Sequence, residues 1–271
     1  MSPTRKQPFG FSLNLFEEAR ILYQSESIQT LRNRFIEIIH GHQVPYAENI
    51  LKTNEWIYYC YYCGLVQSLV TDPTALIIDW GGLYGHVTMI LRTLGYRKVY
   101  NYLLHQSAHY SLFEKEFEIP TLWGEEPNRL NLESHSTEVF ISSGVLEHVR
   151  EDGKGNEELI LLEIHRVLKE RGLFLIWNLP AKLGTSEILA TISGRWHHRY
   201  RYWKKEILKL LKKSNFEVLS INKHKFLPGS ALHLLERWME PFPLTKFDHI
   251  LSHLFPFTIL ARDFLVVARK A

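Results

Sequence analysis

Short apolar runs and amphipathic segments alternate along most of this chain. From residue 11 to about residue 70, the apolar positions recur at the three- and four-residue spacing that is typical of helices. After a turn at residues 71–73, apolar runs of strand length alternate with helical patterns. The predicted strands cover residues 76–79, 98–104, 121–123, 138–142, 173–177, 216–221 and 262–268. This alternation predicts a mostly parallel sheet with helices on both faces.

The helical patterns also predict element boundaries. Gly41 is expected to end the second N-terminal helix. A long helix is expected from Asn156 to Leu168, and Arg171-Gly172 is expected to close it. Its buried side is predicted to carry Leu159, Leu162, Ile164 and Val167. Another helix is expected over residues 204–213.

Composition narrows the class of protein. The 271 residues include 45% hydrophobic residues, which is enough for the core of one α/β domain with additions. The net charge of +3 comes from 32 basic and 29 acidic residues, so the charge balance gives no general case for a nucleic-acid partner. No uninterrupted apolar stretch reaches the ~18 residues of a membrane span, and no secretory signal begins the chain.

The two cysteines, Cys60 and Cys63, are spaced as CxxC within the aromatic run 56–63. This spacing fits half a zinc site, a redox pair or two buried thiols. Buried thiols are favoured because the chain has no second cysteine pair. Low cysteine use is typical of a reducing compartment, so a cytoplasmic location is expected.

A glycine-rich turn follows the first predicted strand. Asp79 ends this strand, and the turn contains Gly81, Gly82 and Gly85 before a helical pattern begins. Strand, acid, glycine turn and helix together are typical of a nucleotide pocket in a doubly wound sheet. The dinucleotide fingerprint GxGxxG fails in both registers. Starting at Gly81 it meets Leu83 and His86 where glycines are required, and starting at Gly82 it meets Tyr84 and Val87.

Several blocks resemble one enzyme family. Asp79–Gly85 resembles the first motif of class I S-adenosylmethionine-dependent methyltransferases, and Ser136–Val149, with its Leu-Glu-His-Val ending, resembles the strand-four motif of their small-molecule, quinone-biosynthesis branch. Leu162–Trp177 is similar to the family's next helix end and fifth strand, and Tyr200–Glu217 to the stretch before strand six. The order and spacing of these blocks fit from about Ala75 to Ala268.

The resemblance implies an α/β fold, namely a Rossmann-like, doubly wound, mostly parallel seven-stranded sheet with an N-terminal helical cap. Residues 1–70 would form this cap or lid, and residues 71–271 the methyltransferase-like domain. An aromatic-rich insertion at about 228–260 would provide a dimer face, a substrate wall or a membrane-surface contact.

The resemblance also implies site residues. S-adenosyl-L-methionine would lie above the turn and against the end of strand four, and Glu125 or Glu126 would bind its adenine amine. His148 is the candidate general base. His197 and His198 fall in an insertion that often covers substrate. The residues expected to bind the cofactor are Asp79, Gly81, Gly82, Gly85, Ser142, Ser143, Gly144 and Glu125.

Structural roles remain open alternatives for several of these residues. Asp79 could cap the following helix, and the acids at 125 and 126 could be solvated loop residues. His148 could bond its own loop, and His197 and His198 could be surface residues. His86 is expected to cap its helix. No metal ligands are expected.

The sequence departs from the family pattern in two places. Leu83 replaces the middle glycine of the turn, and the second strand lacks the terminal acid that would accept two bonds from ribose, leaving His105 or Gln106 as substitutes. We expect methyl transfer to a small molecule, with an oxygen or carbon acceptor favoured and a lipid, quinone precursor or glycan intermediate as substrate. The alternative is a methyltransferase-fold protein with weakened or lost catalysis that serves as a binding or assembly partner.

Overall fold

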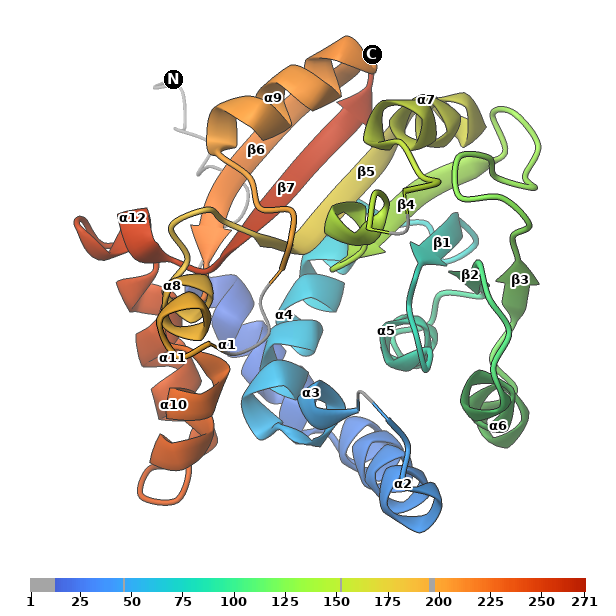
Figure 1. Cartoon of the computed structure of the whole chain (residues 1–271). Coiled ribbons are helices and arrows are strands. Elements are labelled where there is room, and N and C mark those ends of the chain that lie inside the picture. The colour runs from blue at the N-terminus through green and yellow to red at the C-terminus, as the bar shows by residue number, and fades with distance from the viewer. Residues whose placement is uncertain (1–12, 46, 152, 195–197) are drawn as a thin grey trace, which may run out of the picture.

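The protein folds around one twisted sheet with helices on both faces (Figure 1). The computed structural model describes residues 13–271 except residues 46, 152 and 195–197. The described residues form seven strands in the order β3-β2-β1-β4-β5-β7-β6. Strand β7 is antiparallel to both of its neighbours, and the other pairs are parallel. The predicted α/β, Rossmann-like sheet is therefore confirmed.

The strands agree closely with the apolar runs of the sequence. Their bounds are β1 Leu76–Trp80, β2 Lys98–Leu103, β3 Thr121–Trp123, β4 Thr137–Ser143, β5 Leu168–Pro180, β6 Phe216–His224 and β7 Asp263–Lys270.

Two hydrophobic layers cover the sheet because neighbouring strand residues point to opposite faces. Ile77 belongs to a hydrophobic layer that includes residues of α1, α2, α4, α5 and α6, whereas Ile78 belongs to a layer that includes residues of α7 and α9. Figure 1 shows α7 and α9 on one side of the sheet and α4 and α5 on the other. The helices are α1 Leu13–Gln24, α2 Glu26–His42, α3 Glu48–Leu51, α4 Thr53–Leu69, α5 His86–Thr93, α6 Ala108–Phe117, the short 3₁₀ helix η1 Leu146–His148, α7 Glu157–Val167, α8 Thr185–Ile192, α9 Lys204–Lys213, α10 Gly229–Leu235, α11 Pro241–Leu251 and α12 Phe257–Leu260.

Helix α4 is buried on all sides. Every residue from Asn54 to Val66 is buried, as is typical of a helix that is apolar around its whole circumference. Cys60 and Cys63 lie in this helix as free, buried thiols, and burial raises the pKa of both. The prediction of two buried thiols is confirmed. Helix α4 belongs to one of the two hydrophobic layers that cover the sheet.

Helix α7 agrees with its predicted bounds to within one residue at each end, and it ends at Val167 because Leu168 already pairs with Thr137 of β4 in extended conformation. Two other helix predictions were wrong. Leu159 and Leu162 are each 49% exposed, since Ile160, Leu161, Ile164 and Val167 form the stripe that faces the sheet. Helix α2 continues through Gly41 to His42, and Gln43 takes the left-handed capping conformation with φ of 50°.

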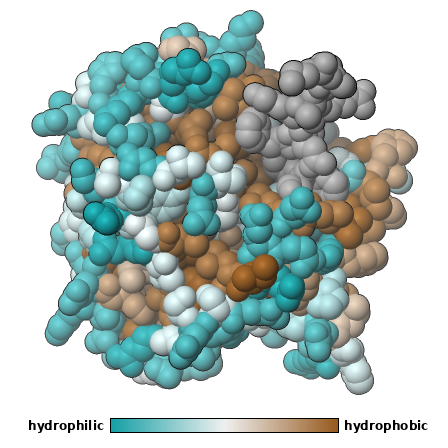
Figure 2. All heavy atoms as spheres, turned by 180° about the vertical axis from the view of Figure 1, so that it is seen from behind, coloured by the Kyte–Doolittle hydropathy of each residue, from teal (hydrophilic) through white to brown (hydrophobic). Residues whose placement is uncertain are grey.

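The aromatic-rich insertion between β6 and β7 forms helices α10, α11 and α12. Several large apolar side chains on it are exposed, with Trp238 and Phe255 both 84% exposed. In the view from behind, apolar atoms gather along the edge of the molecule that these helices occupy (Figure 2). None of the described helices combines the length and the apolar character needed to cross a bilayer.

Candidate functional site

The turn between β1 and α5 is tightly enclosed. Gly81 has φ of +67°, and a Cβ on it would lie 2.5 Å from Cγ2 of Val145. A Cβ on Gly82 would lie 2.4 Å from Oδ2 of Asp79 and 2.6 Å from Oδ1 of Asn101. Both positions therefore require glycine, and the loop can present its backbone to a ligand.

Asp79 lies beneath this turn. Its Oδ2 accepts a hydrogen bond of 2.9 Å from the Thr88 hydroxyl, which ties the end of β1 to the first turn of α5. Burial raises its pKa to about 6, although bonds from the Thr88 hydroxyl and backbone N–H oppose the shift. Asp79 lines neither of the two cavities described next, so its contacts are those of a residue that supports the turn.

A cavity of about 490 Å³, here called the apolar cavity, opens at the carboxyl ends of β1, β2 and β4. This is the edge at which open α/β sheets bind ligands. Leu103, Leu104 and Val145 are among its walls, and they can flank a flat aromatic ring. Glu126 also lines the cavity, whereas Glu125 does not. Glu126 thereby offers a carboxylate acceptor on the wall of an otherwise largely apolar cavity.

Leu83, which stands where the motif described above has a glycine, lies on one wall of this cavity. Leu83 has φ of +47°, so a leucine occupies the left-handed conformation that glycine favours. Its side chain is 41% exposed and lines both cavities, and Asn101 Nδ2 donates a 3.2 Å hydrogen bond to its carbonyl. Leu103, Leu104 and His105 line the cavity at the end of β2. Of these three residues, His105 is the one with a polar side chain that could bind a ribose.

A second cavity, of about 510 Å³ and here called the polar cavity, adjoins the first. Charged and polar side chains from distant parts of the chain line it, namely Glu55, His86, Glu147, His148, Asn178, His198, Lys225, Arg262 and Asp263. Gly81, Leu83, Gly144 and His148 line both cavities. The two cavities therefore meet at the glycine turn and the end of β4.

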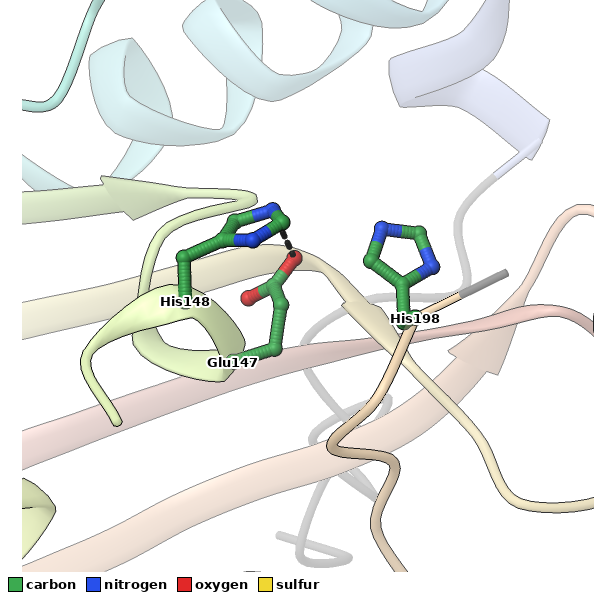
Figure 3. A group of neighbouring side chains, drawn as sticks. All are labelled: Glu147, His148 and His198. Atoms are coloured by element: carbon green, nitrogen blue, oxygen red, sulfur yellow. Dashed lines mark ion pairs between the residues drawn. The ribbon is translucent and has the colours of Figure 1, made fainter. Parts of the chain in front are cut away.

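Glu147 is the most unusual group at this boundary. It is 1% exposed, and neither carboxylate oxygen has a hydrogen-bond donor from another described residue. Burial raises its pKa to about 8, although the nearby His198 opposes the shift. Figure 3 shows Glu147 between His148, which comes from the same short helix, and His198, which comes from the segment after α8.

Each of these two histidines is paired with a carboxylate. Nδ1 of His148 lies 2.7 Å from Oε2 of Glu151, and Nδ1 of His198 lies 2.6 Å from Oε1 of Glu187. The ring centroids of His148 and His198 are 5.5 Å apart. His148 lies 3.9 Å from Glu147, measured from Nε2 to Oε1. The sequence pointed to His148 and His198 separately but did not bring them together, and His197 lies outside the described residues.

Lys225 is a buried cation on the wall of the polar cavity. Nζ of Lys225 donates to Oε2 of Glu55 at 2.7 Å and to Oδ1 of Asn178 at 2.9 Å. Burial raises the pKa of Glu55, but the charges of Lys225 and Arg262 outweigh burial and lower it overall. Asn178 Nδ2 contacts Ser143 Oγ at 3.4 Å, which connects this network to the end of β4.

The remaining predicted site residues separate into two groups. Ser143 and Gly144 line the polar cavity, whereas Ser142 is buried within β4 and lines neither cavity. Gly85 also lies outside both cavities, because its Cα faces Ile119 and a Cβ there would lie 2.6 Å from Ile119 Cδ1.

His86 does not cap its helix, contrary to prediction. Gly85 is the N-cap residue of α5 and has no side-chain bond. The His86 ring instead packs edge-on against Tyr59, 4.4 Å between centroids, and within the described residues neither ring nitrogen has a hydrogen-bond partner. Burial lowers its pKa to about 4, against the opposing charge of Glu55.

Comparisons with known proteins agree with this fold. Residues 78–176 match the family model described as "Methyltransferase domain". Among curated proteins, none matches the chain in sequence. Solved structures share the fold at low identity, and three of them illustrate its range.

The first is a protein of Galdieria sulphuraria proposed to be a sarcosine dimethylglycine methyltransferase, with 16% identity, 89% of this chain and 98% of that chain covered, and a TM-score of 0.58. The second is the 1,6-didemethyltoxoflavin-N1-methyltransferase of Burkholderia thailandensis with bound 1,6-didemethyltoxoflavin and S-adenosylhomocysteine, with 14% identity, coverage of 90% and 88%, and a TM-score of 0.52. The third is the [4+2]-cyclase SpnF, with 13% identity, coverage of 79% and 82%, and a TM-score of 0.53.

The family match covers β1 through most of β5, which is the part of the sheet that builds the apolar cavity. Residues 78–176 therefore match a methyltransferase domain, and this match supports an enzyme that uses S-adenosyl-L-methionine to transfer a methyl group.

Proposed function

We propose that the chain transfers a methyl group from S-adenosyl-L-methionine in the apolar cavity to a hydrophilic small molecule in the polar cavity. The observation that supports this proposal is that Gly81, Leu83, Gly144 and His148 line both cavities. Two ligands would meet at this boundary. Holding both reactants in line supplies most of the rate in a methyl transfer.

The cofactor supplies an activated methyl group on a sulfonium. In this proposal the side chains of Leu103, Leu104 and Val145 flank its adenine, and Glu126 accepts a hydrogen bond from the adenine amine. Gly81 and Gly82 carry the backbone that approaches the amino-acid end. Asp79 holds that backbone in place from below.

The lining of the polar cavity favours a hydroxyl-bearing acceptor. Glu55, Lys225 and Asp263 are charged groups on its wall, and a ligand with hydroxyl groups can form hydrogen bonds with such groups, whereas an apolar ligand cannot. A glycan intermediate or another polyol therefore fits better than a lipid or a quinone precursor. An oxygen acceptor also gives the histidines of the cavity a chemical role, since hydroxyls carry a proton at neutral pH.

His148 is placed to receive that proton. A carboxylate can only accept hydrogen bonds, so the contact with Glu151 puts a proton on Nδ1 of His148 and leaves Nε2 as the base. The acceptor hydroxyl gives its proton to Nε2, its oxygen binds the methyl group, and S-adenosylhomocysteine leaves. Gly144 and Leu83 contribute backbone and apolar surface at the same boundary.

Titration calorimetry with S-adenosyl-L-methionine and S-adenosylhomocysteine tests the cofactor assignment. We expect one binding site per chain, and loss of binding in Gly81→Asp, whose new side chain would meet Val145. Circular dichroism would verify that the variant is folded. Absence of heat at high micromolar ligand would contradict the proposal. Candidate acceptors would then be ranked by the methylated product in mass spectra.

The second candidate function is that of a methyltransferase-fold protein that binds a partner without efficient catalysis. Leu83 in a glycine conformation and the apolar end of β2 favour this alternative. The [4+2]-cyclase SpnF also shows that this fold is found in proteins named for other reactions. Cofactor binding without a methylated product from any hydroxyl acceptor would favour the alternative.

The exposed apolar side chains of α10, α11 and α12 also support a contact surface, formed with a second copy of the chain or with a membrane surface. Trp238, Phe247 and Phe255 are at least half exposed there. Light scattering coupled to size exclusion tests for a dimer, and sedimentation with lipid vesicles tests for membrane contact. A Trp238→Ser/Phe255→Ser double variant should weaken whichever association is observed.

A further inference from the structure

We propose that Glu147, His148 and His198 bind a divalent transition-metal ion, such as Zn²⁺, at the boundary of the polar cavity (Figure 3). Ion binding does not require the proposed function, but it uses Nε2 of His148 as a ligand, so the base role of that nitrogen applies to the metal-free protein. The effect of the ion on methyl transfer rests on the proposed function. Each residue offers one ligand atom, and these three atoms all lie within 4.8 Å of one another.

The spacing is close to that of a metal site. Zinc–ligand distances of about 2.1 Å place the ligand atoms of a tetrahedral site about 3.4 Å apart. Nε2 of His148 already lies 3.9 Å from Oε1 of Glu147. Small rotations of side chains that point toward a common centre would bring the three atoms to coordination distance.

The histidines are oriented as metal ligands usually are. Glu151 holds Nδ1 of His148 at 2.7 Å, and Glu187 holds Nδ1 of His198 at 2.6 Å. Glu187 also accepts a 3.1 Å bond from the backbone N–H of His198. A carboxylate on one ring nitrogen fixes the ring and makes the other nitrogen a better donor to a metal. In both histidines, therefore, a carboxylate contacts Nδ1 as it does in many metal-binding histidines.

Glu147 supplies the second, independent observation. Its carboxylate is 1% exposed and has no donor from another described residue, although buried carboxylates are normally paired with a cation or bound to a metal. Lys225, the nearby buried cation on the cavity wall, already binds Glu55 and Asn178. A metal ion between the two histidines would bring a permanent positive charge to Glu147.

The donor set selects the class of ion. Two imidazoles and one carboxylate suit zinc and similar transition metals, whereas Mg²⁺ and Ca²⁺ prefer oxygen ligands. Three protein ligands leave a coordination position that faces the polar cavity. The structure thus provides a place for an acceptor oxygen, whose proton would pass to solvent water before its bond to the methyl group forms and the bond from sulfur to that methyl breaks.

The test uses full-length protein that has been freed of metal with a chelator. Calorimetry with Zn²⁺ and visible absorption with Co²⁺ should both show one ion per chain. We expect Glu147→Gln and His198→Gln each to weaken zinc binding at least about 10-fold, because each removes one ligand. His135→Gln is the matched control, since His135 is an exposed histidine whose Nδ1 lies 3.2 Å from Glu170, and it should bind zinc like the wild type.

Two outcomes would overturn the metal site. One is absence of zinc or cobalt binding at high micromolar ion. The other is binding that persists unchanged in both Glu147→Gln and His198→Gln, which would place the ion elsewhere. S-adenosylhomocysteine titrations on the same samples report on the proposed function separately, because His198 and Glu147 do not line the apolar cavity.

Discussion

Asp79 of β1 and Asn101 of β2 are paired in register across the sheet, and a side-chain oxygen of each lies within 2.6 Å of the position that a Cβ on Gly82 would occupy. The two strands thereby converge beneath a single backbone position of the turn. The glycine at residue 82 is explained by this contact from below rather than by a requirement for positive φ.

Gly82→Ala should therefore displace the turn. The new methyl group cannot fit beside two buried polar side chains, so the backbone must move, and we expect cofactor affinity to fall at least about 10-fold and stability to fall by about 1–3 kcal/mol. Calorimetry with S-adenosylhomocysteine and urea denaturation would measure both. Gly41→Ala is the control, because nothing lies within 4 Å of its Cβ position in α2. Normal cofactor binding by Gly82→Ala would show that the turn is not part of the cofactor site.

Leu83→Gly should relieve backbone strain. A leucine at φ of +47° carries a penalty of roughly 1–2 kcal/mol that glycine does not. Because the Leu83 side chain is 41% exposed, little buried apolar area is lost. We expect the thermal midpoint to stay level or rise, with cofactor affinity retained. A large loss of cofactor affinity in this variant would mean that the leucine side chain itself contacts the ligand.

Glu147→Gln should change how stability depends on pH in metal-free protein. Burial raises the pKa of Glu147 to about 8 from 4.5, so the folded state holds a proton that the unfolded state releases between these values. Below pH 4.5 Glu147 is protonated in both states and does not lower the free energy of unfolding. As the pH rises from 4.5 through 8, the free energy of unfolding falls because the buried carboxyl resists ionisation. Glutamine cannot ionise, so the variant should be more stable than wild type by up to about 5 kcal/mol at about pH 9 and by less than about 1 kcal/mol at about pH 5. Urea denaturation of both proteins at the two pH values measures this difference in stability. Equal stability of variant and wild type at about pH 9 would contradict the prediction.

Lys225→Met should be strongly destabilising because it leaves Glu55 buried without its partner. Breaking one side of a buried ion pair costs about 3–5 kcal/mol. The double variant Glu55→Gln/Lys225→Met should recover much of that loss. A double-mutant cycle by urea denaturation measures the coupling, and additive effects of the two substitutions would argue against a tight pair.

The variants His148→Gln and His198→Gln distinguish two proposed roles of the histidines in the polar cavity, namely general base and metal ligand. If His148 is the base, its loss should lower kcat by about 10²–10⁴-fold without zinc in the buffer. His198→Gln should then alter turnover only when zinc is present. Single-turnover assays with and without a chelator provide the comparison, and full turnover by His148→Gln would exclude it as the base.

Much of the fold follows from local pattern. The strand predictions held because the centres of runs 76–79 and 138–142, at residues 77–78 and 139–141, are apolar and buried on both faces of the sheet. Leu159 and Leu162 were assigned to the wrong side of α7, since a helix with apolar residues at most positions does not show which stripe meets the sheet. The turn at α2 was likewise misplaced because Gln43, and not Gly41, adopts the left-handed cap.

The site was harder to predict because its members are far apart in the chain. Lys225 and Glu55 are 170 residues apart, and no periodicity connects them. Glu147 did carry a signal, as an acid between Leu146 and His148 in a recognised block, but only the folded structure shows that it is buried with no hydrogen-bond donor from another described residue. His198 becomes informative only once the segment after α8 is placed beside η1.

The shared boundary of the two cavities has a thermodynamic consequence. Gly81, Leu83, Gly144 and His148 belong to both walls, so whichever ligand binds first fixes the conformation of groups that the second must contact. Cofactor and acceptor affinities should then be linked, and linkage is reciprocal: the factor by which one ligand tightens the other is the same in both directions. The order in which the ligands are added would change the path to the ternary complex but not its total free energy.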